Sequence, residues 1–73
     1  MKRGATIRTR RKGEGIKQSE LAARLGIGCS TLCAYELGDR PMPEDVYYDA
    51  DAAISAILAD RARARDALMS EAR

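Results

Sequence analysis

Apolar residues recur at helical spacing in four stretches of the chain, and glycines or prolines separate these stretches. Residues 3–12 carry one strongly apolar position, Ile7, among basic residues. In residues 18–25 and 29–37 the apolar positions lie three or four apart, which places them on one face of a helix. A last pattern without Gly or Pro covers about 44–70. The chain is therefore predicted to be all-α, with four or five helices and a long helix at its C-terminal end.

A chain of 73 residues is about half as long as an ordinary domain, so we expect a single domain over residues 1–73 without a large active-site cleft. No apolar run approaches the roughly 20 residues that span a bilayer, and no signal-peptide core follows the N-terminus. We therefore expect a cytoplasmic protein without a membrane partner. Histidine is absent, which excludes histidine-based catalysis. We predict no enzymatic activity, no cofactor and, in so short a chain, no small-molecule ligand.

The two cysteines, Cys29 and Cys33, lie four residues apart in one predicted helix. A disulfide between them would have to reach along a full helical turn, so we expect two reduced thiols. Two thiols cannot form a four-ligand zinc site within one chain. A redox or metal role would need further groups from a second protomer, and we interpret both residues as small, tolerated side chains.

The net charge is only +2, but its distribution along the chain is uneven. Residues 1–40 hold nine Lys or Arg against four acids, whereas the remaining residues hold four Arg against seven acids. This division is typical of a protein with one surface that faces a polyanion and another that avoids it. An ordinary solvated mixture of charges accounts for it equally well.

Residues 18–37 have the spacing of a helix-turn-helix motif, in which two short helices are joined by a sharp turn. Gly26 can adopt the positive φ that the turn requires, and Ala22 is small where the two helices cross. Five larger side chains in the same register are predicted to fill the wedge between the helices: Leu21, Leu25, Ile27, Leu32 and Tyr35. The complete register makes the motif specific.

With this motif the chain resembles the lambdoid repressor and Cro-like (XRE-type) family of helix-turn-helix DNA-binding proteins. The resemblance covers about residues 5–58, and its strongest segments are Gly15-Ile16-Lys17-Gln18, Leu21-Ala22, Leu25-Gly26-Ile27, Ser30-Thr31-Leu32, Tyr35-Glu36-Leu37-Gly38 and Arg40-Pro41. It implies that the third helix enters the major groove, that Gln18 bonds a phosphate, and that the protein dimerises on palindromic sites. It also implies an ion pair between Arg11 and Glu36. Lys17 and Gly28 replace the usual capping residues, so looser helix starts are expected.

Two groups of residues are predicted to contact DNA. Gln18 and a basic rim would bind the phosphate backbone, the rim being formed by Arg10, Arg11, Lys17 and Arg40. On the third helix the residues expected to meet the bases are Cys29, Ser30, Thr31 and Ala34. Residues 29–37 contain no Arg, Asn or Gln, the side chains that read bases with two hydrogen bonds. Specificity would then depend on apolar contacts, DNA shape and bridging water, or would be absent altogether.

The apolar face of the last helix is longer than a domain of this size needs for its own core. We expect it to form a homodimer interface through Ala53, Ile54, Ile57, Leu58 and Leu68, although the face could instead pack only on the protomer's own helices. The predicted function is a sequence-specific regulator of transcription that binds double-stranded DNA, acting as a dimeric repressor on a palindromic operator. The alternative is a protein-interaction module of the same fold, such as an antitoxin or antirepressor subunit.

Overall fold

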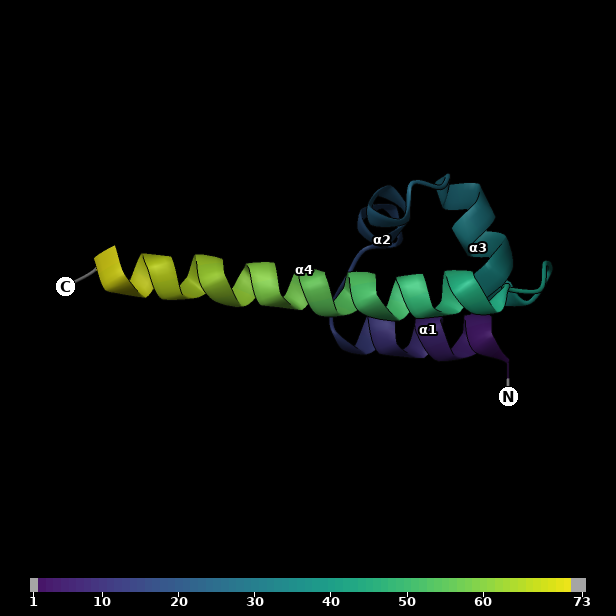
Figure 1. Ribbon diagram of the computed structural model, residues 1–73, viewed down its shortest axis with the longest axis horizontal. Coiled ribbons are helices and arrows are strands. Elements are labelled where there is room, and N and C mark those ends of the chain that lie inside the picture. Colours follow the sequence, from purple (N-terminus) through teal and green to yellow (C-terminus); the bar gives the residue numbers. More distant parts are fainter. Residues whose placement is uncertain (1, 72–73) are drawn as a thin grey trace.

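The computed structural model describes residues 2–71, and this part of the chain forms four α-helices and no strands (Figure 1). They are α1 (Arg3–Gly13), α2 (Gln18–Leu25), α3 (Cys29–Leu37) and α4 (Glu44–Glu71). The predicted all-α fold, the helix-turn-helix and the long C-terminal helix are confirmed. None of the described helices combines the length and the hydropathy needed to cross a membrane.

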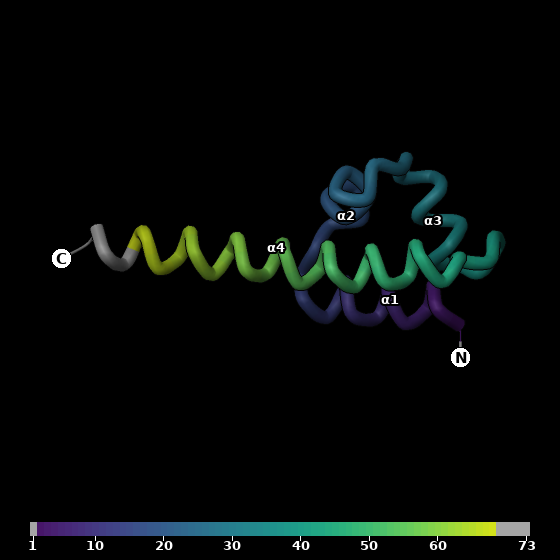
Figure 2. Tube along the Cα trace, viewed as in Figure 1, coloured from purple at the N-terminus to yellow at the C-terminus, as the bar shows by residue number. Residues whose placement is uncertain are grey.

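Helix α4 determines the shape of the molecule, which measures 49 × 23 × 18 Å. Its 28 residues correspond to about 42 Å of helix. The first half of α4 packs on α1 and α2, and α3 packs on α1 and α2 in turn. The second half extends past the other three helices toward the C-terminus, as the tube in Figure 2 shows. The molecule is thus a small helical core with one projecting helix.

The core is built from aliphatic side chains of all four helices and the segments between them. Its buried members are Ile7, Ile16, Leu21, Ala22, Leu32, Met42, Ala50, Ile54 and Ile57. The sequence predicts Ile54 and Ile57 at a dimer interface, but the structure corrects this prediction because their side chains are only 0% and 2% exposed. Side chains that are covered by the protomer's own helices have no surface left for a second protomer. Ala53 and Leu58 pack against the core while partly exposed, whereas Leu68 is 68% exposed.

Helices α1 and α3 approach each other closely at Gly4. A Cβ atom at this position would lie 1.8 Å from the carbonyl oxygen of Tyr35, so any larger residue would force the two helices apart. Nothing in the sequence pattern marks this glycine, because the contact joins segments about thirty residues apart in the chain.

Ion pairs fix α4 to α2 where it leaves the core. The Nη2 atom of Arg61 lies 2.9 Å from Oε1 of Glu20. Asp60 pairs with Arg24 of α2 and also with Arg63 of its own helix. The hydrogen bond from Arg24 is the main reason why the pKa of Asp60 lies below its ordinary value. These pairs hold α4 against α2 at the point where its projecting half begins. Because they are exposed, they contribute little to the free energy of unfolding.

Candidate nucleic-acid interface

The turn between α2 and α3 has the geometry that the sequence predicts. Gly26 adopts a left-handed conformation with φ of 69°. The backbone N–H of Gly26 donates to Ala23 O at 3.2 Å, and that of Ile27 donates to Ala22 O at 3.1 Å. Gly28 is extended, with φ of −73° and ψ of 152°, and α3 begins directly after it. The left-handed glycine satisfies the last carbonyl groups of α2 and reverses the chain within a few residues.

The wedge between α2 and α3 is filled less evenly than predicted. Leu21 and Leu32 are fully buried, and Ala22 is buried where the helices cross. The other three predicted members pack against the core but remain partly exposed: Leu25, Ile27 and Tyr35. The wedge therefore depends mainly on two leucines, and the other side chains line its edge.

The first turns of α2 and α3 begin without side-chain caps among the described residues. Neither Lys17 nor Gly28 makes a side-chain hydrogen bond at the cap position, although each carbonyl accepts a backbone hydrogen bond from the helix. The first N–H groups of a helix have no acceptor within it, and they carry the positive end of the helix dipole. Such a helix start favours an anion such as a DNA phosphate.

Beneath this surface, Arg11 of α1 and Glu36 of α3 form a bidentate ion pair. Arg11 Nε donates to Glu36 Oε2 at 2.8 Å, and Arg11 Nη2 donates to Oε1 at 2.9 Å. Arg11 Nη1 also donates to the carbonyl oxygen of Ile16 at 2.8 Å. The pair that the resemblance implied is therefore present.

The environment of Arg11 differs from the expectation of an exposed residue on a basic rim. Arg11 is 7% exposed and Glu36 is 4% exposed. The hydrogen bond to Glu36 raises the pKa of the Arg11 guanidinium. Since the guanidinium is buried and bonded to groups of the protein, the structure gives Arg11 a positioning role and argues against a direct phosphate contact.

Gln18 joins the same network from the first position of α2. Its Nε2 atom donates to Glu36 Oε1 at 3.2 Å, so one carboxylate oxygen links α1, α2 and α3. Gln18 is partly exposed. Because an amide nitrogen carries two protons, Gln18 can donate to Glu36 and to a phosphate at the same time. Glu36 thus orients the residue that is predicted to bind the backbone.

The residues predicted to meet the bases lie outside the core. Cys29 and Ser30 are exposed, and Thr31 and Ala34 are partly exposed. Cys29 and Cys33 are free thiols, as expected. In the described part of the chain, no group of three or more His, Cys, Asp or Glu side chains could hold a metal ion. The surface of α3 therefore offers hydroxyl, thiol and methyl groups to a ligand.

The predicted basic rim is brought together only in part. Lys17 and Arg40 are exposed near the two ends of the motif. Arg10, by contrast, is directed toward α4, where it pairs with Asp51 and donates to Ser55 Oγ at 3.1 Å. The reason is helical geometry, because neighbouring residues of α1 point in different directions. We therefore leave Arg10 out of the candidate interface.

Comparison with known families agrees with this geometry. A family model described as helix-turn-helix matches residues 7–47, which span most of α1, all of α2 and α3, and the start of α4. No curated protein and no solved structure matches the chain. The matched segment covers more than half of the 73 residues. The chain therefore belongs to the helix-turn-helix family of the Cro/XRE type and is a DNA-binding regulator.

Proposed function

We propose that this chain is a dimeric transcriptional repressor that binds a palindromic operator through α3 of each protomer. The observation that carries the proposal is the exposed start of α3, in a helix-turn-helix that is joined to α1 at the buried carboxylate of Glu36. Repression needs only a bound dimer that covers promoter DNA, and a single domain is sufficient for that. We therefore propose that residues 1–73 act as one DNA-binding domain, with residues 44–70 as its C-terminal helical extension for dimerisation. Such a protein acts in the compartment that holds the DNA.

Base recognition in this proposal depends on small side chains. Ser30 and Thr31 each offer a hydroxyl group, Ala34 offers a methyl group to thymine, and Cys29 offers a thiol. Single hydrogen bonds and methyl contacts discriminate less between bases than a bidentate Arg or Gln does. We therefore propose that the shape of the DNA and bridging water contribute a large share of the specificity.

Dimerisation is proposed to use the projecting half of α4 together with the partly exposed Ala53 and Leu58. Ala64 and Leu68 are both exposed and lie four residues apart, so they share one face of the helix beyond the core. Ala64 is small enough to allow a second helix to approach closely. A two-fold axis through this contact would present two copies of α3 to two half-sites.

Selection from a pool of randomised DNA duplexes tests the proposal. We expect enrichment of a palindrome whose half-sites lie one helical turn, about 10 base pairs, apart. Enrichment of a single half-site would contradict the dimer, and the absence of enrichment would contradict sequence-specific binding.

A second candidate is a protein-interaction module, such as an antitoxin or antirepressor subunit. Two observations favour it: α3 contains no Arg, Asn or Gln, and Leu68 lies exposed on the projecting helix. In that case the selection would enrich no sequence. The protein would act by binding another protein through α4.

A further inference from the structure

Arg61 of α4 contacts the loop that leads into α2. Its Nη1 atom donates to the carbonyl oxygen of Glu14 at 3.2 Å, and its Nη2 atom lies 3.5 Å from that of Gly15, at the limit of a hydrogen bond. The buried Arg11 donates to the next carbonyl oxygen, that of Ile16, at 2.8 Å. Three consecutive carbonyl groups before α2 therefore meet two arginines, one from α1 and one from α4.

This loop determines where the first turn of α2 lies. Gly15 adopts a left-handed conformation with φ of 66°, and the side chain of Ile16 is buried in the core. Lys17 and Gln18, which are both predicted to contact phosphate, follow directly in the chain. A hydrogen bond to phosphate weakens once its donor is displaced by a few tenths of an ångström. Contacts that hold the loop therefore also hold the predicted phosphate contacts.

The same guanidinium neutralises an acid in the first turn of α2. Arg61 Nη2 lies 2.9 Å from Glu20 Oε1, and both side chains are 39% exposed. The start of a helix attracts a carboxylate of its own first turn and a phosphate of DNA for the same reason, the positive end of the helix dipole. Without a cation beside it, Glu20 would repel the phosphate. Arg61 supplies the charge that cancels this repulsion.

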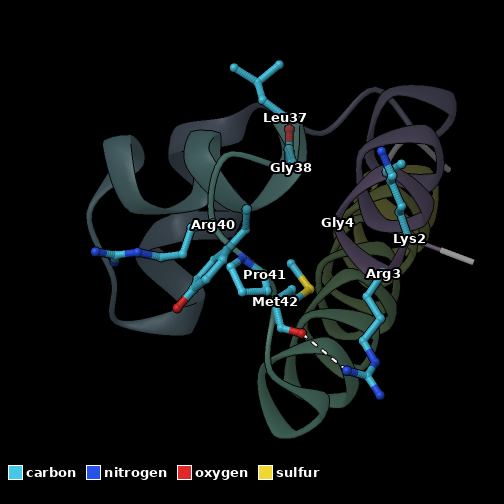
Figure 3. A pocket seen from close by; sticks show the side chains of 11 residues that line it. Lys2, Arg3, Gly4, Leu37, Gly38, Arg40, Pro41 and Met42 are labelled. Carbon is cyan, nitrogen blue, oxygen red and sulfur yellow. Dashed lines mark hydrogen bonds between the residues drawn. The ribbon is translucent and has the colours of Figure 1, made fainter.

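The contacts of α4 at its other end are looser. Arg3 Nη1 donates to the carbonyl oxygen of Met42 at 3.4 Å, the dashed line in Figure 3. Arg3 Nη2 lies 4.0 Å from a carboxylate oxygen of Glu44, compared with 2.9 Å for the pair of Arg61 and Glu20. Exposed ion pairs of either kind contribute little to stability. What distinguishes Arg61 is its place, beside the start of the helix that is predicted to bind phosphate.

We infer that Arg61 is a positioning residue of the DNA interface, which holds the start of α2 from α4 and cancels the charge of Glu20 there. The inference rests on the proposed binding of a phosphate by Gln18. Arg61 itself touches no phosphate. Because α4 is also the proposed dimer helix, this contact joins the dimer element to the phosphate-binding end of α2.

The test is a comparison of variants that each remove one positive charge from α4. Arg61→Gln is measured alone and together with Glu20→Gln. Arg63→Gln is the matched control, because Arg63 also belongs to an exposed ion pair of α4, and its partner Asp60 keeps a second partner in Arg24. Each full-length variant is titrated at several salt concentrations against the duplex enriched by selection and against a duplex of unrelated sequence. Thermal unfolding and sedimentation show whether fold and oligomeric state are retained.

We expect Arg61→Gln to weaken the binding of both duplexes by about threefold for each protomer, or about tenfold for a dimer, at low salt. The difference should shrink as salt rises, because the Debye length falls below about 10 Å above 0.1 M salt. Arg63→Gln should change the affinity by less than about twofold. Adding Glu20→Gln to Arg61→Gln should recover at least about threefold of the lost affinity, because it removes the uncancelled charge.

This recovery separates the inference from a purely structural role of the pair. Glu20→Gln restores no hydrogen bond to the loop and no ion pair, so it cannot repair a loss that comes from stability alone. If Arg61→Gln disturbs the fold, Arg61→Lys serves in its place. It keeps the charge but has one nitrogen instead of a fork, so it should lose part of the affinity at every salt concentration.

Two results would overturn this inference: equal affinities of Arg61→Gln and Arg63→Gln, or a loss in Arg61→Gln that Glu20→Gln does not reduce. If Gln18→Ala still weakens binding in that case, the proposed function stands. No binding of either duplex by the unaltered chain would overturn both.

Discussion

Arg11 and Glu36 form a buried ion pair whose two hydrogen bonds, at 2.8 and 2.9 Å, join α1 to the helix that is proposed to read DNA. Exposed ion pairs contribute little because water already solvates both charges, but a buried pair cannot lose one member without leaving a charge in the protein. The pair therefore makes the position of α3 dependent on α1. Gln18, bonded to the same carboxylate, extends this dependence to the start of α2.

Arg11→Ala is expected to lower the free energy of unfolding by about 3–5 kcal/mol, because it leaves the carboxylate of Glu36 buried without its partner. Arg10→Ala is the matched control, since its ion pair with Asp51 is exposed and should contribute about 0–1 kcal/mol. Denaturant unfolding measures both. In a double-mutant cycle, Arg11→Ala and Glu36→Ala should show a coupling of about 0.5–3 kcal/mol. Simple additivity of the two effects would mean that the side chains are not coupled.

Leu32→Ala and Leu25→Ala are expected to differ in how much they lower the free energy of unfolding, although the sequence alone places both leucines in the wedge between α2 and α3. Leu32 is fully buried, so its truncation should cost about 2–5 kcal/mol. Leu25 is partly exposed, and its truncation removes less buried surface and leaves a smaller cavity. Chemical denaturation of the two variants compares them directly. An equal loss of stability would contradict the edge position of Leu25.

The dependence of DNA affinity on salt should report the number of phosphates that the protein neutralises. If a dimer neutralises about eight phosphates, log affinity should fall with log salt at a slope near −7. Arg40→Ala should weaken binding to all sequences and reduce the slope by about 1 for each phosphate that Arg40 neutralises. Gln18→Ala should weaken binding without changing the slope, because an amide carries no charge. A slope near zero in the unaltered protein would rule out the phosphate contacts.

Ala34→Gln should change which bases the selection enriches and leave the fold intact. Ala34 is only partly buried on α3, so a longer side chain can extend outward, and Gln can bond adenine with two hydrogen bonds. Selection with the variant measures the preference, and circular dichroism checks the fold. Ala23→Gln, at an exposed position of α2, serves as the control and should leave the enriched sequence unchanged. If Ala34→Gln enriches the same sequence with the same affinity, α3 does not present this residue to the bases.

Leu68→Glu should weaken the proposed dimer and leave the stability of the protomer core unchanged. The side chain is 68% exposed, so a charge there meets mostly water in the monomer. Sedimentation equilibrium measures the association. Ile54→Ala is the contrast, since it should destabilise the core by about 2–5 kcal/mol because Ile54 is buried within the protomer. An unchanged dissociation constant for Leu68→Glu would exclude the projecting helix as the contact.

The helices and the motif could be predicted from the sequence because their causes are local. The bounds of α2 and α3 follow from apolar spacing and from glycines at which the chain turns, such as Gly26 with its positive φ. The assignment to the helix-turn-helix family follows from the same register, which the family model matches over residues 7–47. These features need no knowledge of which helices meet.

The tertiary structure decided which side chains are available for function, because burial depends on contacts between segments far apart in the chain. Ile54 and Leu68 both look like interface residues in the sequence, but α1 and α2 cover only the half of α4 that contains Ile54. Arg10 and Arg11 are neighbours of the same type, yet helical geometry directs one toward Asp51 and the other into the buried pair with Glu36. Gly4 meets the carbonyl group of Tyr35 only because the start of α1 packs on the end of α3.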